Sequence, residues 1–454
     1  MDKLFGTDGV RGLANSGPMS AEMIMAIARA TAHVCKRHHR QEEMRPKIVI
    51  GKDTRLSGYM LESALTAGIC SMGVDVLLVG PIPTPGLAYI THSMRADAGI
   101  VISASHNPFH DNGIKIFSRS GTKLPDDEER EIEELVRADN LSAMGAAPEE
   151  IGKARRIEDS KGRYIEFCKR SFPDACDLDG IKLVLDCANG ATYQCAPVIF
   201  SELGAEVETI FNRPDGMNIN EACGSQYPET LIEKVRAGGA DAGLAFDGDG
   251  DRLIAVDEHG RVLTGDHLLA ICAKAWKGEG RLANDTVVGT QMTNFGFMTA
   301  MQDLGVNVER AKVGDRYVLE RMKQRGAVLG GESSGHLIFS DIHTTGDGIV
   351  SALQVLAIMR TSGKPLSELA DVMKLAPQRL INIDVAEKKS IDDVPPLREA
   401  VSAAETELGD RGRVLIRYSG TQPLCRVMVE GPDEATTTRL AESLSAVVRE
   451  HLGA

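Results

Sequence analysis

The chain has 454 residues, more than one compact core normally holds, and a prior of about 150 residues per domain predicts roughly three domains. Its 65 acidic residues against 51 lysines and arginines give a formal charge of −14, which argues against nucleic-acid binding over a broad face. No apolar run reaches the ~18 residues of a membrane span, and the opening residues lack the apolar core of a signal peptide. Nine scattered cysteines without a CxxC pair are typical of reduced thiols, so we expect a cytoplasmic protein.

Short β-branched runs alternate with longer segments whose apolar residues recur at helical spacing. This alternation predicts βαβ units, and because the pattern restarts twice it predicts three similar α/β units of about 100 residues each. Strands are expected at residues 47–51, 74–79, 99–102, 181–186, 240–246, 286–289 and 327–330, with helices such as 19–35 and 61–72 between them.

The last part of the chain has a different pattern. Residues 379–385 alternate apolar and polar side chains, and two further strands are expected at 414–418 and 426–430. A helix is expected from about 435 to 451. A small sheet with a helix beside it predicts an α+β tail domain.

Polar loops follow several predicted strands, and ligands of open α/β sheets bind at the carboxyl ends of strands. The loop at residues 103–108 contains Ser105 and His106. A serine at a strand end can act as a nucleophile when a neighbouring group activates it. An ordinary Ser/Asn/Pro turn is the alternative interpretation.

The loop that begins at Asp247 carries three aspartates at alternate positions, Asp247, Asp249 and Asp251. Three such carboxylates repel one another unless a cation neutralises them, and their hard oxygens suit Mg²⁺ or Ca²⁺. An EF-hand would need glycine where Arg252 stands and helices where the flanks are predicted strands. An aspartyl-phosphate enzyme with Asp247 as nucleophile is a second alternative, against which the extra aspartate and the serine loop argue.

Two further loops have the composition of ligand sites. Residues 330–336 place Glu332 and Ser334 on a glycine-rich turn, where they can pair with sugar hydroxyls, and His336 can carry a proton. Residues 417–423 combine two hydroxyls, backbone amides around a glycine and a flanking arginine, which matches the geometry of a phosphate. Plain connecting turns are the alternative for both loops.

Taken together, these loops and the opening residues 5–12 resemble the α-D-phosphohexomutase family, in family order and over nearly the whole chain. The opening resembles the subgroup that acts on an amino sugar. The resemblance implies a fold of three similar mixed α/β-sheet domains and a smaller α+β carboxyl-terminal domain around a central cleft. The implied domains are residues 1–155, 156–257, 258–373 and 374–454.

The resemblance also implies the roles of individual residues. Ser105 would carry the phosphoryl group and join Asp247, Asp249 and Asp251 around one Mg²⁺. The residues implied in substrate binding are Glu332, Ser334, Arg252, Arg417, Ser419, Gly420, Thr421 and Arg426.

Proton transfer requires a further group near the reacting hydroxyl. Lys115 resembles the family's acid/base lysine, and we expect Arg11 and Arg252 to lower its pKa by like-charge proximity. His106 and His336 are alternative proton carriers. Residues 313–317 depart from some relatives, which carry a lysine–histidine pair there, and the role of this segment is left open.

The resemblance implies an intramolecular phosphotransferase that interconverts glucosamine 6-phosphate and glucosamine 1-phosphate through a phosphoserine. Glucosamine 1,6-bisphosphate would be its intermediate and activator, and its product would feed UDP-N-acetylglucosamine and cell-wall precursor synthesis. The alternatives are a mannose- or glucose-phosphate mutase of the same family, the aspartyl-phosphate phosphatase and a non-catalytic sugar-phosphate-binding module. The expected partner is a small hexosamine phosphate; a homodimer is compatible with the sequence, which does not reveal the oligomeric state.

Overall fold

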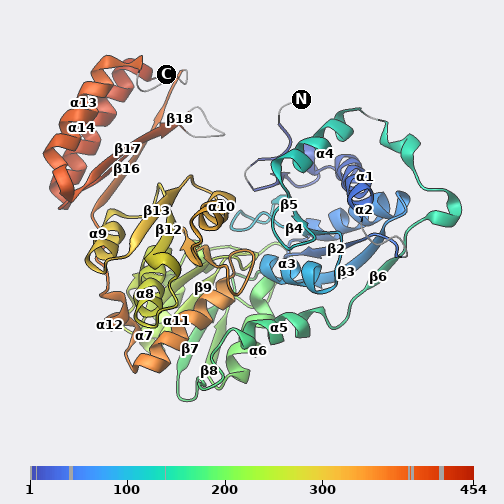
Figure 1. Ribbon diagram of the computed structural model, residues 1–454, viewed down its shortest axis with the longest axis horizontal. Helices are drawn as coiled ribbons and strands as arrows, with labels where there is room; N and C mark the ends of the chain where they lie inside the picture. Colours follow the sequence, from blue (N-terminus) through green and yellow to red (C-terminus); the bar gives the residue numbers. More distant parts are fainter. Residues whose placement is uncertain are drawn as a thin grey trace. The chain divides into compact units, whose positions relative to one another are not determined.

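The computed structural model describes residues 3–6, 8–39, 44–138, 140–386, 389, 393–418 and 424–453 (Figure 1). The chain forms two compact units. The first comprises Met1–Met292 and Val306–Val372, and the second comprises Thr293–Gly305 and Met373–Ala454. None of the helices in the described part of the chain is both long and apolar enough to cross a membrane.

The first sheet of the first unit has six strands in the order β1-β5-β4-β2-β3-β6. They are β1 (Val10–Leu13), β2 (Lys47–Lys52), β3 (Asp75–Pro81), β4 (Ala98–Ile102), β5 (Asp111–Ser118) and β6 (Ala154–Arg156). The strands β2, β3, β4 and β6 are parallel to their neighbours in that set, whereas β5 runs antiparallel to β4 and β1. The helices of this region are α1 (Ala21–His38), α2 (Ser57–Ser71), α3 (Thr84–Ser93), α4 (Asp126–Ala138) and α5 (Ser160–Arg170).

Alternating side chains of these strands are covered by different helices, as the two-residue period of a strand requires. Ile48 and Ile50 of β2 belong to a buried cluster with residues of α1 and α2, which lie side by side (Figure 1). Gly99 of β4 faces α3, because a Cβ atom there would lie 2.1 Å from Oγ1 of Thr91. The central strands β2 and β4 are therefore covered by helices, whereas the edge strand β6 is exposed.

The second sheet has the order β11-β10-β9-β7-β8, and the third has the order β13-β12-β14-β15. Each combines parallel pairs with an antiparallel edge. The strands are β7 (Lys182–Asp186), β8 (Glu206–Ile210), β9 (Ala242–Phe246), β10 (Leu253–Asp257), β11 (Val262–Leu263), β12 (Thr286–Thr290), β13 (Asn307–Ala311), β14 (Leu329–Gly331) and β15 (Leu337–Phe339). The helices are α6 (Cys195–Glu202), α7 (Glu229–Gly238), α8 (Gly265–Gly278), α10 (Asp315–Arg325), α11 (Gly348–Ser362) and α12 (Leu366–Ala370).

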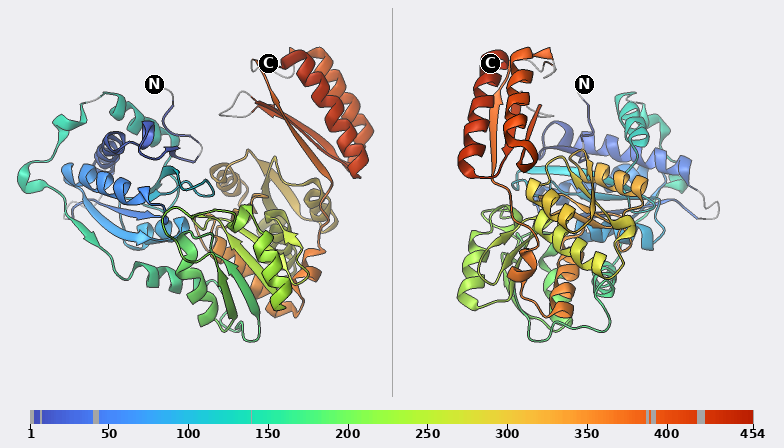
Figure 2. Two further views of the ribbon diagram at one scale, coloured as in Figure 1. Left: turned by 180° about the vertical axis from the view of Figure 1, so that it is seen from behind. Right: turned by 60° about the vertical axis from the view of Figure 1, so that its left-hand side comes forward.

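The second unit contains an antiparallel sheet in the order β16-β18-β17. Its strands are β16 (Gln378–Asp384), β17 (Arg413–Tyr418) and β18 (Leu424–Glu430), and its helices are α9 (Phe295–Asp303), α13 (Pro395–Leu408) and α14 (Glu434–Leu452). The helices α13 and α14 lie next to each other against this sheet (Figure 2). Val427 of β18, Leu397 of α13 and Leu440 of α14 share its core.

The fold class predicted from the sequence is confirmed: three mixed α/β sheets precede a smaller α+β domain. The predicted strands lie within one or two residues of the observed ones. Among the described residues, short 3₁₀ helices lie at Gly17–Met19, Leu141–Met144, Pro148–Glu150, Ala191–Tyr193, Gly224–Gln226, Ala283–Asp285 and Gly409–Arg411. The domain boundaries stay a prediction.

One buried histidine makes the fold sensitive to acid. His343 follows β15, and its Nε2 lies 3.0 Å from the carbonyl oxygen of Pro85 while its Nδ1 accepts the backbone N–H of Thr344 at 2.8 Å. A carbonyl can only accept, so the ring is the neutral Nε2–H tautomer. Burial lowers the pKa of His343 to about 4.

Between pH 6.5 and 4 the unfolded chain therefore binds a proton at His343 that the folded chain does not, and stability falls as the pH falls. We expect the wild type to lose about 3 kcal/mol more than His343→Gln between pH 7 and pH 4 in denaturant unfolding. The amide of the variant keeps a donor for Pro85 but does not titrate. His259→Gln, at an exposed position, is the control and should retain the wild-type slope; equal slopes for the wild type and His343→Gln would contradict the prediction.

Candidate active site

Ser105 lies in the loop that follows β4, with its side chain buried beneath the loop between β9 and β10. Its Oγ donates a hydrogen bond of 2.6 Å to Oδ2 of Asp247. Its backbone has φ of +53°, in the left-handed region that is unfavourable for residues other than glycine. Strain of this kind persists only where surrounding contacts hold it.

Two side chains hold the carbonyl groups of the serine loop. Arg55, which is fully buried, donates to the carbonyl oxygens of Ser105 and Asn107 at 3.1 and 2.5 Å. Asn220 donates to the same two oxygens at 2.8 and 2.9 Å. Ser103 completes the support, because its Oγ accepts the backbone N–H of Ser105 at 2.9 Å and donates to Asp53 at 2.6 Å.

Asp53, Arg55 and Asn220 are not among the site residues predicted from the sequence. A signal existed for the first two, since charged residues directly follow the buried strand β2 at the same sheet edge as the serine loop. No comparable signal marks Asn220, which lies 115 residues from Ser105 in the sequence.

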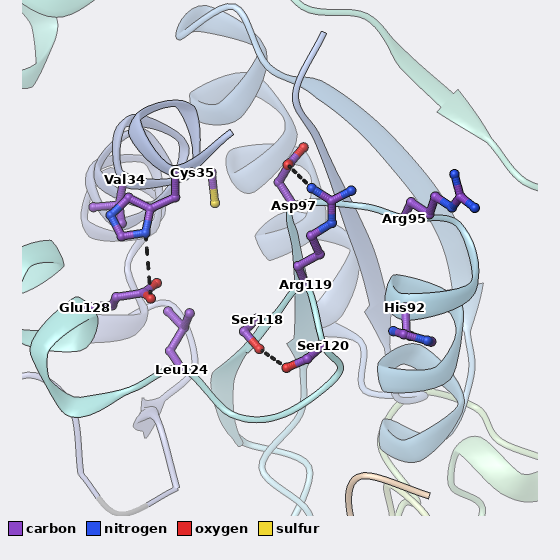
Figure 3. A pocket seen from close by; sticks show the side chains of 11 residues that line it. Val34, Cys35, His92, Arg95, Asp97, Ser118, Arg119, Ser120, Leu124 and Glu128 are labelled. Atoms are coloured by element: carbon purple, nitrogen blue, oxygen red, sulfur yellow. Dashed lines mark hydrogen bonds and ion pairs between the residues drawn. The ribbon is translucent and has the colours of Figure 1, made fainter. Parts of the chain in front are cut away.

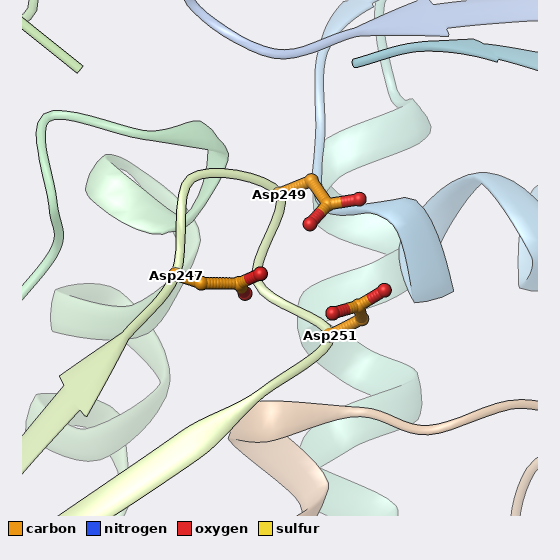
Figure 4. A group of neighbouring side chains, drawn as sticks. All are labelled: Asp247, Asp249 and Asp251. Atoms are coloured by element: carbon orange, nitrogen blue, oxygen red, sulfur yellow. The ribbon is translucent and has the colours of Figure 1, made fainter. Parts of the chain in front are cut away.

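The three aspartates of the β9–β10 loop converge as the sequence predicted (Figure 4). Asp247, Asp249 and Asp251 are all buried, and each has a carboxylate oxygen within 4.8 Å of the others. Gly250 allows the tight turn with φ of +73°. Thr84 fixes the loop from α3, because it donates through its N–H to the carbonyl of Asp249 at 2.8 Å and through Oγ1 to its carboxylate at 2.6 Å.

This donor set fits a divalent cation with a preference for oxygen. The Oδ1 atoms of Asp249 and Asp251 are buried and have no hydrogen-bond partner among the described residues. Burial and the neighbouring charges of Asp251 and Asp249 raise the pKa of Asp247 well above its usual value. Buried carboxylates with spare lone pairs are what Mg²⁺ or Ca²⁺ would neutralise.

Lys115 lies in the site, but its predicted pKa shift is wrong. Its Nζ, on β5, donates to Asp249 at 2.6 Å and to Asp251 at 3.2 Å. Burial and Arg11 would lower the pKa of this ammonium, yet the two carboxylates outweigh them and raise it. The lysine is therefore a cation that partly neutralises the aspartates, because the register of β5 points it at the acids.

The two histidines of the site have opposite protonation preferences. Burial, together with the charges of Arg252 and Arg11, lowers the pKa of His106 to about 4. Its Nδ1 lies 3.1 Å from Arg252 and 3.3 Å from Oγ of Ser105, so a neutral acceptor nitrogen faces the serine. Burial opposes the charge on His336, but Asp251 and other nearby carboxylates raise its pKa to about 9.

Loops of the first and third sheets complete the surroundings of the triad. Glu332 accepts the backbone N–H of Gly314 at 2.9 Å, and Ser334 lies half-buried on the same turn. Arg11, on β1, lies 3.5 Å from Asp8. The Nε atoms of Arg11 and Arg252 are buried and have no hydrogen-bond partner among the described residues, although Nε of Arg252 lies 3.9 Å from Oδ1 of Asp251.

The predicted phosphate loop belongs to the second unit. Arg417 and Arg426 are directly opposite each other on β17 and β18, and burial together with Arg426 lowers the pKa of Arg417. Among the described residues Nε of Arg426 has no partner. Ser419, Gly420 and Thr421 lie outside the described residues, and their role stays a prediction.

A cavity of about 700 Å³ lies at the opposite ends of β4 and β5 from the serine loop (Figure 3). Cys35 and His38 of α1 line it, together with Arg95 and Arg119. Asp97, which directly precedes β4, is also on its wall, whereas Ser105 lies beyond the other end of that strand. The cavity is therefore separate from the triad.

Three mixed α/β sheets, a smaller α+β domain and a buried aspartate triad are the features expected of a phosphosugar mutase. Four family models, described as Phosphoglucomutase/phosphomannomutase domains I, II, III and C-terminal, match residues 2–142, 162–260, 264–376 and 380–447. The chain belongs to the phosphoglucomutase/phosphomannomutase family.

Within this family the chain is similar over its full length to phosphoglucosamine mutases. That of Syntrophus aciditrophicus is 59% identical over 453 residues, which cover 100% of both chains. That of Syntrophotalea carbinolica is 57% identical over 451 residues, which cover 99% of this chain and 98% of the relative.

Solved structures share the fold. A phosphoglucomutase/phosphomannomutase family protein from Burkholderia thailandensis aligns with a TM-score of 0.82 at 25% identity, over 99% of this chain and 97% of that one. An N-acetylphosphoglucosamine mutase from Aspergillus fumigatus, in complex with GlcNAc-6P and magnesium, aligns with a TM-score of 0.68 at 17% identity, over 98% and 95%.

Asp251→Asn tests the triad as a metal site. The substitution removes one charge from the donor set, and ligand charge governs the affinity of oxygen sites for hard cations. Calorimetric titration of the wild type with Mg²⁺ should show one site per chain, and the variant should bind at least about tenfold more weakly. The exposed Asp341→Asn is the control and should bind like the wild type; unchanged affinity in Asp251→Asn would contradict the assignment.

Proposed function

We propose that the chain is an intramolecular phosphotransferase that interconverts glucosamine 6-phosphate and glucosamine 1-phosphate through a phosphoserine at Ser105. The observation that carries this proposal is the 2.6 Å hydrogen bond from Ser105 Oγ to Asp247, within a buried triad of aspartates. Relatives that are 54–59% identical over essentially the full chain and are named phosphoglucosamine mutase support the amino sugar as substrate.

The residues divide into those that hold a cation and those that meet the substrate. Asp247, Asp249 and Asp251, with the oxygen on Ser105, would hold Mg²⁺. When bound, this ion neutralises negative charge that develops on the transferring phosphoryl group. Glu332 and Ser334 would pair with sugar hydroxyls, as their place on one glycine-rich turn allows.

In the forward step a free hydroxyl of the sugar monophosphate attacks the phosphorus atom of phosphorylated Ser105. The new bond joins the sugar oxygen to phosphorus, and the bond between phosphorus and Oγ breaks. The attacking hydroxyl loses its proton and Oγ regains one, so a group that exchanges protons must lie beside Oγ. We assign the two proton transfers to His106, whose Nδ1 lies 3.3 Å from Oγ, and to Lys115, which contacts Asp249 and Asp251; the proton that the sugar hydroxyl gives up replaces the one that Oγ takes up, so the step conserves protons.

The product of this step is glucosamine 1,6-bisphosphate, which must reorient before its other phosphate returns to Ser105. The non-reacting phosphate then needs cations that serve both orientations. In the first unit, Arg11 and Arg252 have buried Nε–H groups without a hydrogen-bond partner among the described residues. Arg417 and Arg426 are cross-strand neighbours in the second unit, and each set of arginines is a candidate for holding a phosphate. Dianionic phosphates favour such forked donors.

We place the reaction in the cytoplasm, where thiols stay reduced. All nine cysteines are free thiols, and seven of them are buried. The product would feed UDP-N-acetylglucosamine and cell-wall precursor synthesis. A homodimer stays a prediction.

A comparison of substrates tests the proposed activity. Turnover of glucosamine 6-phosphate, glucose 6-phosphate and mannose 6-phosphate is measured in coupled assays with Mg²⁺ and the matching bisphosphate. We expect the highest kcat/KM with the amino sugar. A preference for glucose or mannose phosphate would refute the amino-sugar assignment but not the mutase chemistry, and no turnover of any of them would refute both.

Ser105→Ala tests the phosphoserine. Loss of the only atom that carries the phosphoryl group should lower kcat at least about 10³-fold, while sugar-phosphate binding is largely retained. Intact-mass spectrometry should find an acid-stable phosphate on the wild type and none on the variant. The control, Ser120→Ala at an exposed position, should match the wild type. An acid-labile acyl phosphate that survives in Ser105→Ala would instead indicate the aspartyl-phosphate phosphatase.

A further inference from the structure

Residues 314–316, which we call the bridge loop, lie at the start of α10 and contact three other parts of the first unit. Gly314 has φ of +126°, a conformation open to glycine, and it presents its N–H to Oε1 of Glu332 at 2.9 Å. The first contact of the loop is therefore with the carboxylate that the proposed function assigns to the sugar.

The second contact runs through Asp315, whose side chain is only 12% exposed. Its Oδ1 accepts a hydrogen bond of 2.6 Å from Lys123, on the segment that follows β5. Its Oδ2 lies 3.6 Å from Nε2 of His336, and Nδ1 of the same ring lies 3.6 Å from Asp251. Asp315 thereby links the first sheet region to the histidine that faces the triad.

The third contact joins the guanidinium of Arg316 to α4 and to Leu124, which precedes that helix. Its NH2 donates to the carbonyl of Leu124 at 2.7 Å and to Glu129 at 2.8 Å, and its NH1 contacts Glu129 at 3.4 Å and also Asp126. The Arg316 and Glu129 side chains are 14% and 13% exposed. A forked contact between partly buried partners fixes orientation as well as distance.

We infer that Arg316 and Asp315 are positioning residues for the mutase reaction: by tying the start of α10 to α4 and Lys123, they hold Glu332 and His336 in place beside the metal loop. This inference rests on the proposed function, because it assigns Glu332 to the sugar. An ion pair that merely stabilised the fold would change stability and leave the kinetic constants unchanged. A positioning role changes the binding and turnover of the substrate, since small misplacements of binding groups cost up to ~10²-fold in rate.

Arg316→Ala is the main test. We expect kcat/KM for glucosamine 6-phosphate to fall by about 10- to 100-fold, mostly through KM, because Glu332 loses its fixed support. Hydrogen exchange of the Gly314 amide should be faster than in the wild type. Arg325→Ala is the matched control: Arg325 lies on the same helix, in an ion pair of 3.0 Å with Glu309 that does not reach α4. It should leave both readouts unchanged.

Glu129→Gln replaces one of the two carboxylate oxygens that accept hydrogen bonds from Arg316. It is the alternative variant if Arg316→Ala does not fold. It should lower kcat/KM several-fold alone and add nothing in the Arg316→Ala background, since the two residues act through one contact. Unchanged kinetics or unchanged exchange of Gly314 in a folded Arg316→Ala protein, or additive effects of the two substitutions, would overturn the inference. Wild-type protein that turns over no hexosamine phosphate would refute the proposed function instead, and the exchange comparison would still test the bridge loop.

Discussion

The constraint on which the site depends is the repulsion of three buried carboxylates that share one loop. Asp247, Asp249 and Asp251 approach within 4.8 Å of one another, where unscreened like charges are costly. Positive charge on the surrounding elements offsets this repulsion, since Lys115 of β5 contacts Asp249 and His336, in the loop between β14 and β15, lies beside Asp251. A site with this much negative charge can accept a cation, and a cation bound beside Ser105 would neutralise charge in the phosphoryl transfer that we propose.

Two unfavourable features accompany the placement of the Ser105 hydroxyl: a strained backbone conformation and the burial of a charged side chain. Ser105 has a left-handed backbone conformation, and the fully buried Arg55 donates hydrogen bonds to the carbonyl oxygens of the serine loop. Buried charged groups seldom add to stability compared with apolar residues of equal size. The hydrogen bonds of Ser105 to Asp247 and of Arg55 to the serine loop hold these groups in a fixed geometry.

Each of the three sheets contributes different side chains to the site, because polar loops follow the carboxyl ends of their strands. The first sheet supplies the serine and Lys115, the second supplies the acids, and the third supplies the turn with Glu332 and His336. The bridge loop joins the first and third of these contributions through Lys123 and Arg316. The contacts of Lys123 with Asp315 and of Arg316 with Leu124 and Glu129 therefore connect the loops of the first and third sheets directly.

Local pattern in the sequence determined the fold class, the strand positions, the serine loop and the acidic loop, because period-two and helical spacing and the chemistry at strand ends are properties of short segments. The tertiary structure alone decided which charges meet. Lys115 has a raised pKa rather than a lowered one, since strand register places it against Asp249 and Asp251. Asn220 acts on a serine 115 residues away, and Arg316 reaches Glu129 across 187 residues. Such contacts depend on how the chain returns to the same point in space, which no local pattern encodes.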